Sequence, residues 1–222
     1  WLQIRQAKPD YVILWGWGVM NPTALKAAAK VGFPRNKVLG VWWAGSEEDV
    51  IPAGDAAKGY VTAAFSAPGT GFPVMQDIKN KLYANGKGNL EDASRLGSIY
   101  HTRGVSYGII IVEAIRKAQE KFGKGKSITG EQMRWGIENL NIDNAMLKKL
   151  GAEGFMPELK ISCMDHEGSG KVKFQQWDGK QWKVITDWID ADKSIVRPMI
   201  EESAAKYGKE KNIAPRDCSK ES

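Results

Sequence analysis

The sequence predicts an α/β protein in which a parallel sheet is followed by a portion built from helices and a β-hairpin. Within the first 65 residues, short apolar runs of strand length alternate with helical patterns. This alternation is typical of parallel strands that are joined by crossover helices. From about Gly97 the pattern changes to longer helices, and the Asp178-Gly179 pair between two alternating stretches is a strong hairpin signal.

The first portion begins with a helix and continues with strands. Residues 1–10 have the apolar spacing of the last turns of an amphipathic helix, which ends in a Lys-Pro-Asp turn. The next helix has Asn21 as its expected N-cap, Pro22 as its first residue and Gly32 just beyond its end. Strands are expected over residues 11–14, 37–42 and 58–65.

Helices dominate the second portion. Residues 105–112 are apolar nearly all round, which predicts a helix buried between layers that Gly123 ends. Thr129 and Gln132 form a capping box for the next helix. The hairpin is expected within residues 171–189, and a polar helical tail follows it. Because the first portion has no opening strands and the second has little sheet to pack on, we expect a fragment of a larger two-domain protein.

Composition narrows the class of protein. The chain has 222 residues, a net charge of +6 and no run that approaches the roughly 20 apolar residues of a membrane helix. Its lysines are scattered along predicted helix faces, which indicates a solvated basic surface and no nucleic-acid partner. Cys163 and Cys218 lack the C-x-x-C spacing of zinc sites. They can form one disulfide in an oxidising compartment and are otherwise free thiols.

Motifs for catalysis, cofactors and metals are incomplete. The two histidines, His101 and His166, lie in no motif with a nucleophile or with metal ligands. The turn at residues 16–18 lacks the third glycine of a dinucleotide fingerprint, since position 21 is Asn. Residues 164–170 hold two acids and a histidine, but adjacent residues of a turn rarely converge on one ion. We predict no enzyme, no cofactor and no metal site, with a nucleotide-using α/β enzyme as the competing hypothesis.

Four tryptophans follow the ends of two predicted strands. Trp15 and Trp17 come after the first strand, and Trp42 and Trp43 come at the end of the second. In open α/β sheets, ligands bind beyond the carboxyl ends of the strands. We therefore expect the two pairs to lie side by side at one rim. By strand alternation, two of the four would face a ligand and two would pack under helices.

These stretches resemble a known family. The segments that carry the resemblance are "AKPDYVILWGWGVMNPTALKAAAKVGF", "KVLGVWWAGSEEDV", "AAKGYVTAAF", "GSIYHTRGVSYGIIIVEAIRKA" and "KFQQWDGKQW". In this order they are similar to the second half of a type I periplasmic binding protein, of the branched-chain amino-acid binding family of ABC transporters. The similarity spans nearly the whole chain, and the ordered series carries it more than any single motif.

The resemblance implies a two-lobed α/β fold with parallel sheets, represented here without its N-terminal half. Residues 1–95 would be the later part of the C-terminal lobe. Residues 96–187 would belong to the N-terminal lobe as helices plus a hairpin, and residues 188–222 would form a crossover and the helical tail. The unpaired strand edge of such a fragment implies self-association.

The implied function is that of an extracytoplasmic solute-binding component of an ABC importer, located in the periplasm. It would bind a small molecule in the cleft between the lobes and present that molecule to a membrane permease. A ligand-sensing domain of a receptor shares this fold and is a further hypothesis. In a periplasmic protein, a disulfide between Cys163 and Cys218 would tie the C-terminal tail to the hairpin region.

The resemblance also implies a binding site. Trp17, after Gly16, aligns with a family tyrosine in a ligand-contacting position, and Trp15 is interpreted as structural. Trp42 aligns with the acidic residue that pairs with the ammonium of an amino-acid ligand. Because that acid is an indole here, we expect an aromatic or other non-amino-acid carboxylate, stacked on Trp17, Trp42 or Trp43. A branched-chain amino acid is the alternative ligand.

Two further positions belong to the predicted site. Tyr100 and His101 fall where the family has its hinge-side pocket wall, and His101 could hydrogen-bond a ligand oxygen. Glu47 or Glu48 could replace the missing acid, but both are interpreted as early-helix acids near a positive helix end.

Overall fold

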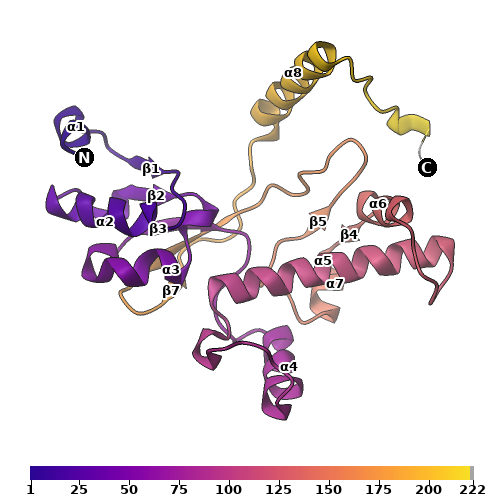
Figure 1. Ribbon diagram of the computed structural model, residues 1–222, viewed down its shortest axis with the longest axis horizontal. Helices are drawn as coiled ribbons and strands as arrows, with labels where there is room; N and C mark the ends of the chain where they lie inside the picture. Colours follow the sequence, from indigo (N-terminus) through magenta and orange to yellow (C-terminus); the bar gives the residue numbers. More distant parts are fainter. Residues whose placement is uncertain (221–222) are drawn as a thin grey trace. The chain divides into compact units, whose positions relative to one another are not determined.

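A five-stranded sheet organises the first of two units in the computed structural model, which describes residues 1–220 (Figure 1). This first unit comprises Trp1–Ile109, Asn144–Pro157 and Val172–Ile189. The second unit comprises Ile110–Asp143, Glu158–Lys171 and the described residues from Asp190 onward.

The strands of the sheet are β1 (Val12–Leu14), β2 (Val38–Gly40), β3 (Val61–Ala64), β6 (Lys173–Trp177) and β7 (Trp182–Val184). Their order in the sheet is β1-β2-β3-β6-β7, with β1, β2 and β3 parallel. The second unit has a small antiparallel sheet of β4 (Asn141–Ile142) and β5 (Leu159–Lys160). The predicted α/β class, the parallel portion and the hairpin around Asp178-Gly179 are therefore confirmed.

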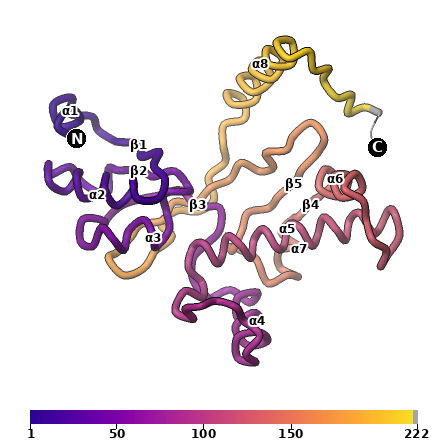
Figure 2. Tube along the Cα trace, viewed as in Figure 1, coloured from indigo at the N-terminus to yellow at the C-terminus, as the bar shows by residue number. Residues whose placement is uncertain are grey.

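The hairpin of β6 and β7 joins the same sheet as the parallel strands. Strand β6 pairs antiparallel with β3, and Figure 2 shows the orange segment near residue 175 returning to the strands of the first third of the chain. The buried side chain of Gln175 donates from Nε2 to the carbonyl of Gly45 (2.9 Å) and to Oγ1 of Thr62 (3.2 Å). The sequence places the hairpin in a different lobe from these strands, because nothing local in the sequence specifies such a long-range partner. The division at residues 95 and 187 stays a prediction.

The helices are α1 (Leu2–Ala7), α2 (Met20–Lys30), α3 (Glu47–Val50), α4 (Pro73–Lys81), α5 (Ile99–Phe122), α6 (Gly130–Glu138), α7 (Asn144–Lys149) and α8 (Lys193–Lys211). The capping box at the start of α6 is confirmed, since Oγ1 of Thr129 accepts the N–H of Gln132 and Oε1 of Gln132 accepts the N–H of Thr129. None of the described helices combines the length and the apolar character that crossing a membrane requires.

The start of α2 differs from the prediction. Val19 is the N-cap, and Asn21 lies inside the first turn, where it is fully buried. Its Nδ2 donates to Oδ1 of Asp49 at 2.7 Å, so the side chain serves a tertiary contact instead of a cap. At the other end, Gly32 adopts a positive φ of 73° just beyond the helix, as predicted.

The core of the first unit lies between the sheet, α2 and the turns that follow the strands. Its buried members are Leu25, Val38, Val50, Ala53, Ala57, Tyr60, Ile99, Trp177 and Trp182. The hydroxyl of Tyr60 donates to the carbonyl of Ala44 at 3.1 Å, and burial raises the pKa of this phenol far above its ordinary value. This bond fixes the turn that follows β2, which carries two of the four tryptophans.

The apolar run of α5 is not buried all round, which corrects the prediction for residues 105–112. Tyr107, Ile111 and Val112 are each close to half exposed, whereas Ser106 and Ala114 are buried. Several large apolar side chains of the helix therefore face outward. An apolar run sets the tendency of a segment to be buried but does not fix which of its residues are covered.

Candidate ligand-binding site

The carboxyl ends of β1 and β2 lie at one edge of the parallel sheet. The N–H of Val41 donates to the carbonyl of Leu14 at 3.2 Å, which holds the two strand ends together. Trp15 and Trp17 follow β1, and Trp42 begins a 3-10 turn, Trp42–Ala44, that follows β2. The sequence segments that carry the tryptophans are therefore neighbours in space, as strand geometry predicts.

Trp43 is the centre of the aromatic contacts. Its ring lies edge-on to Trp17 with a centroid distance of 5.5 Å, and edge-on to Trp15 at 6.3 Å. Trp42 packs on Trp43 at 5.0 Å and on Phe65 at 5.3 Å. We call these five residues the aromatic surface. Sequence analysis missed Phe65, although it follows β3 just as the tryptophan pairs follow β1 and β2.

The aromatic surface is open to solvent. The side chains of Trp15 and Trp17 are 72% and 67% exposed, and Trp42 and Trp43 are half-buried. The expectation that two of the four tryptophans pack under helices is therefore wrong. Strand alternation does not apply to them, because all four lie in turns after their strands have ended. Exposed indoles at a strand-end rim are unusual for core residues and suit a binding surface.

Arg103 adds a cation to this surface. It lies on α5, one turn after Tyr100, and its guanidinium carbon is 4.5 Å from the ring centroid of Trp42 and 5.4 Å from that of Tyr100. Its Nη2 also donates to the backbone carbonyl of Trp42 at 2.9 Å. Sequence analysis missed this residue, because the helical spacing of Tyr100 and Arg103 does not by itself indicate a partner on another element.

Three acidic residues follow the tryptophan turn, and each is engaged within the protein. Oε2 of Glu47 accepts the N–H of Ile99 at the start of α5 (2.9 Å), and burial raises the pKa of this carboxyl. Glu48 forms an ion pair with Arg95. Asp49 accepts hydrogen bonds from Asn21 and from Ser46, whose hydroxyl begins a capping box for α3. Each of these carboxylates therefore already has a structural role.

Gly16, between Trp15 and Trp17 in the chain, is buried and makes room for Asn21. A Cβ atom at position 16 would overlap the side-chain oxygen of Asn21, which is fixed by its bond to Asp49. The absence of a side chain is thus required by packing inside the first unit. Whether Gly16 also approaches a ligand stays a prediction.

The structure does not gather His101 with the tryptophans. Its ring lies edge-on to Tyr83 at 6.2 Å, and among the described residues no ring contact joins it to the aromatic surface. Its buried Nδ1 has no hydrogen-bond partner in the part of the chain that the structure describes, and burial lowers the pKa of the imidazole. Tyr100, the other predicted residue of this pair, is half exposed and lies beside Arg103.

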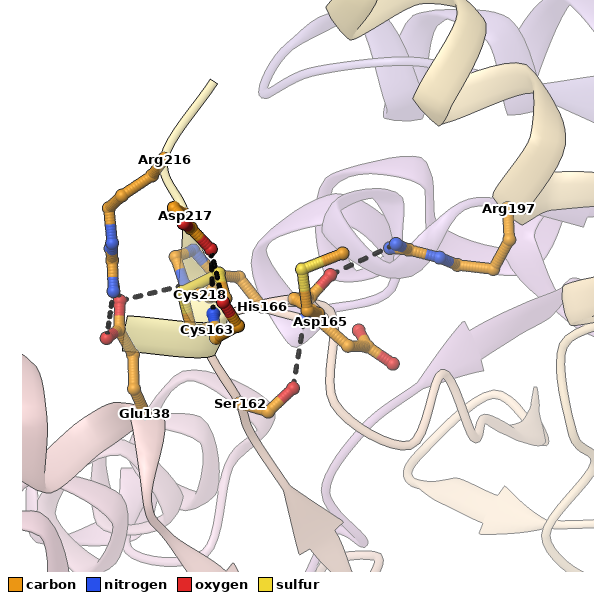
Figure 3. Close-up of a disulfide and its surroundings, with 11 residues drawn as sticks. Glu138, Ser162, Cys163, Asp165, His166, Arg197, Arg216, Asp217 and Cys218 are labelled. Carbon is orange, nitrogen blue, oxygen red and sulfur yellow. Dashed lines mark hydrogen bonds and ion pairs between the residues drawn. A yellow bond between two sulfur atoms is a disulfide. The ribbon is translucent and has the colours of Figure 1, made fainter. Parts of the chain in front are cut away.

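In the second unit, a disulfide joins Cys163 and Cys218 with a Cα–Cα distance of 5.7 Å (Figure 3). Beside it, Arg216 donates to both carboxylate oxygens of Glu138, at 2.8 and 2.5 Å, and Nε2 of His166 lies 3.1 Å from Oε1. The two hydrogen bonds from Arg216 lower the pKa of Glu138. We call these five residues the tail clasp, since they hold the segment that follows α8.

The acids near the tail clasp are also paired. Lys193 donates to Oδ2 of Asp165 at 2.7 Å, and Arg197 donates to Oε1 of Glu167 at 3.0 Å. The hydrogen bond from Lys193 lowers the pKa of Asp165. The acids and histidine of residues 164–170 are therefore part of an ion-pair network between this loop, α6 and the residues around α8.

Two hollows in the described residues lie apart from the tryptophans. One of about 460 Å³ is lined by β4, β5 and the Asp165–Lys193 pair, and one of about 440 Å³ lies beside Glu47 and Arg95. No residue of the aromatic surface lines either of them. Within the first unit, the candidate site is described by its partly exposed rings, and neither of these two hollows coincides with it.

Comparison with protein families identifies the fold. Residues 1–181 match the model of a family described as periplasmic binding protein. The chain belongs to this family. Its mixed α/β architecture with a parallel sheet is the type I periplasmic binding fold, and the resemblance in the sequence is confirmed. The family is one of solute-binding proteins, which implies an extracytoplasmic location.

Similar solved structures support the assignment of the chain to the periplasmic binding protein family. One, described as an ABC transporter permease from the Pseudomonas fluorescens group, is 48% identical with a TM-score of 0.94, and the match covers 98% of this chain and 52% of that one. A branched-chain amino-acid ABC transporter from Thermus thermophilus with bound valine is 25% identical with a TM-score of 0.64, covering 86% and 48%. No curated protein matches the sequence. The chain spans about half the length of the solved structures that it matches.

A more distant relative has an aromatic ligand. This solute-binding protein of an ABC transporter from R. palustris, in complex with benzoate, is 15% identical with a TM-score of 0.56, covering 86% of this chain and 47% of that one. At this level of identity the likeness concerns the fold alone.

Proposed function

We propose that the protein is the extracytoplasmic solute-binding component of an ABC importer and that its ligand is a small aromatic carboxylate. The role in transport is supported by the family and by the 48% identical structure described as part of an ABC transporter. The function is binding without catalysis: the protein captures the ligand and presents it to a membrane permease. Self-association of the fragment through an unpaired strand edge stays a prediction.

The observation that carries the ligand class is the aromatic surface. A flat ring placed at the strand-end rim would meet Trp17, Trp42 and Trp43, whose exposed faces and edges suit stacked or edge-on packing. Each aromatic pair of this kind contributes about 0.5–1.5 kcal/mol beyond the area that it buries. An aliphatic side chain of a ligand would gain free energy from the burial of its apolar area but not the additional contribution of an aromatic pair.

The acids near the site argue against an amino-acid ligand. Trp42 stands where the resemblance places the partner of a ligand ammonium, and Glu47, Glu48 and Asp49 each have an internal partner. A hydrogen bond to a charged group contributes about 1.5–3 kcal/mol. An amino acid would lose a contribution of this size, whereas a carboxylate without an ammonium would not.

A calorimetric titration of the protein, as its cell produces it, tests the proposal. The panel comprises benzoate, phenylacetate and cinnamate, against leucine and valine, with adenine and nicotinamide nucleotides as a third group. We expect at least one aromatic acid to bind about tenfold or more tightly than either amino acid. Preference for leucine or valine would refute the aromatic ligand, and tight binding of a nucleotide would refute the transport role.

A further inference from the structure

Arg103 is held in a fixed position against the aromatic surface. Its guanidinium lies over the ring of Trp42 at 4.5 Å and near that of Tyr100 at 5.4 Å. The hydrogen bond from Nη2 to the carbonyl of Trp42, at 2.9 Å, fixes the orientation of the planar group. Two ring contacts and one hydrogen bond from another element are more than a solvated surface arginine ordinarily has.

The charge of Arg103 has no carboxylate partner within the described residues. Four other arginines, Arg95, Arg116, Arg197 and Arg216, each form an ion pair with a glutamate. The acids whose charges act on Arg103 from nearby elements are Glu47 and Asp49, and neither forms an ion pair with it. Arg35 is also half-buried and forms no ion pair within the described residues, but Arg103 is the one that lies against the aromatic surface.

Burial makes the lack of a partner costly. Partial removal from water lowers the pKa of Arg103, because a low-dielectric environment disfavours the charged form. Half-buried charges without a counter-charge destabilise a fold, and such groups are concentrated at functional sites. An anion supplied by a ligand would complete the site.

The guanidinium has hydrogen-bond donors with which to bind such an anion. It carries five N–H donors, and one of its nitrogens donates to Trp42 in the structure. A planar fork of this kind binds a carboxylate through two parallel hydrogen bonds, which a lysine ammonium cannot do. A carboxylate at Arg103 would carry its attached ring beside Trp42, which packs on both Trp43 and Phe65.

We infer that Arg103 is the anchor of the ligand carboxylate and that the site selects planar aromatic acids over their neutral amides. This inference rests on the proposed function, since it names a determinant of specificity within the same site. Arg103 sets the position of the charged group, and the aromatic surface binds the ring. The acid without the ring and the ring without the acid would each lose one of these two contributions.

Paired titrations test the anchor. Benzoate, phenylacetate and cinnamate are each measured against their own amides, with wild type, Arg103→Met and Arg103→Lys. Methionine keeps much of the apolar packing and removes the charge, whereas lysine keeps the charge and removes the fork. Arg116→Met is the matched control, because Arg116 lies on the same helix and is paired with Glu113.

In wild type we expect the acid to bind at least tenfold more tightly than its amide. Arg103→Met should abolish this preference with little effect on the amide, Arg103→Lys should reduce it, and Arg116→Met should leave it unchanged. Retention of the full acid preference in Arg103→Met would overturn the anchor while leaving the proposed function standing. If Arg103→Met does not fold, an unchanged preference in Arg103→Lys would overturn it. If wild type binds none of the acids or amides, the proposed function itself fails.

Discussion

The tail clasp and the aromatic surface differ in how far their side chains are bonded to one another. In the tail clasp, Glu138 receives two hydrogen bonds from Arg216, and the disulfide closes the arrangement covalently. In the aromatic surface, two indoles are more than 60% exposed, and the neighbouring Arg103 has no carboxylate partner among the described residues. A region whose groups bond to one another contributes to stability, whereas a region with exposed rings and an unpaired charge is suited to bind a ligand. Variants in the two regions should therefore separate stability from binding.

The largest effect is expected from the disulfide of the tail clasp. Cys163 and Cys218 are 55 residues apart, and closing a loop of this length stabilises the folded state by about 4 kcal/mol in the chain-entropy model. Cys163→Ser with Cys218→Ser should lower the free energy of unfolding by up to this amount and expose the tail to proteases. Denaturant unfolding and limited proteolysis measure the two effects.

Ligand affinity provides the contrast for this double variant. It should remain close to that of wild type, and reductant should reproduce the loss of stability in the wild-type protein. An unchanged rate of tail proteolysis after reduction would show that the covalent bond does not hold this segment.

A smaller effect, of the opposite kind, is expected from Trp17→Ala. The exposed ring contributes little to folding, so the free energy of unfolding should change by less than about 1 kcal/mol. Loss of its ring contact should weaken the binding of an aromatic acid about tenfold, which equals about 1.4 kcal/mol of binding free energy. Calorimetry and denaturant unfolding of the same preparation give both numbers.

The matched control for Trp17 is Trp188→Ala. Trp188 is half-buried and lies under the ammonium of Lys173 at 4.7 Å, without a ring contact to the aromatic surface. This variant should leave affinity unchanged. Equal losses of affinity in both variants would contradict a specific role for Trp17.

The smallest effect concerns the response of the tail clasp to acid. Since Arg216 lowers the pKa of Glu138 in the folded state, the ion pair stabilises the fold at neutral pH. This contribution is complete above the ordinary pKa of a glutamate and is lost as the pH falls through the lowered value in the folded protein. Its size is about 1 kcal/mol or less, because Arg216 is partly exposed.

The pH dependence is measured as the difference in unfolding free energy between wild type and Glu138→Gln. This difference should be largest near neutral pH and should shrink in acid. A difference that grows in acid would reverse the sign of the linkage. The affinity of the aromatic surface should not follow this titration, because neither Glu138 nor Arg216 belongs to it.

Local signals predicted much of the fold. The parallel order of β1, β2 and β3 followed from apolar runs and helical spacers, and Gly32 and the capping box at Thr129 marked helix ends through the chemistry of their own neighbourhood. Asn21 shows the limit of such signals. An asparagine near a helix start has the chemistry of a cap, but the amide of Asn21 donates to Asp49, which lies far along the chain. A local pattern does not indicate such a partner.

The candidate site was predictable in part for the same reason. The tryptophan pairs could be placed together because each follows a parallel strand, and Phe65 could have been added by applying that argument to β3. Arg103 could not have been found in this way. Its role depends on the approach of α5 to the turn at Trp42, and a contact between residues 61 positions apart has no local pattern in the sequence.

The pairing of β6 with β3 has a consequence for the time course of synthesis. Thr62 and Gln175, which share a hydrogen bond across this pair, are separated by 113 residues. At translation rates of about 5–20 residues per second, β3 is made roughly 6 to 23 s before the strand that covers its edge. During that interval the nascent chain carries an open β edge beside apolar residues. It reaches the folded sheet only if aggregation is slower than the synthesis of the covering strand or if a chaperone protects the edge.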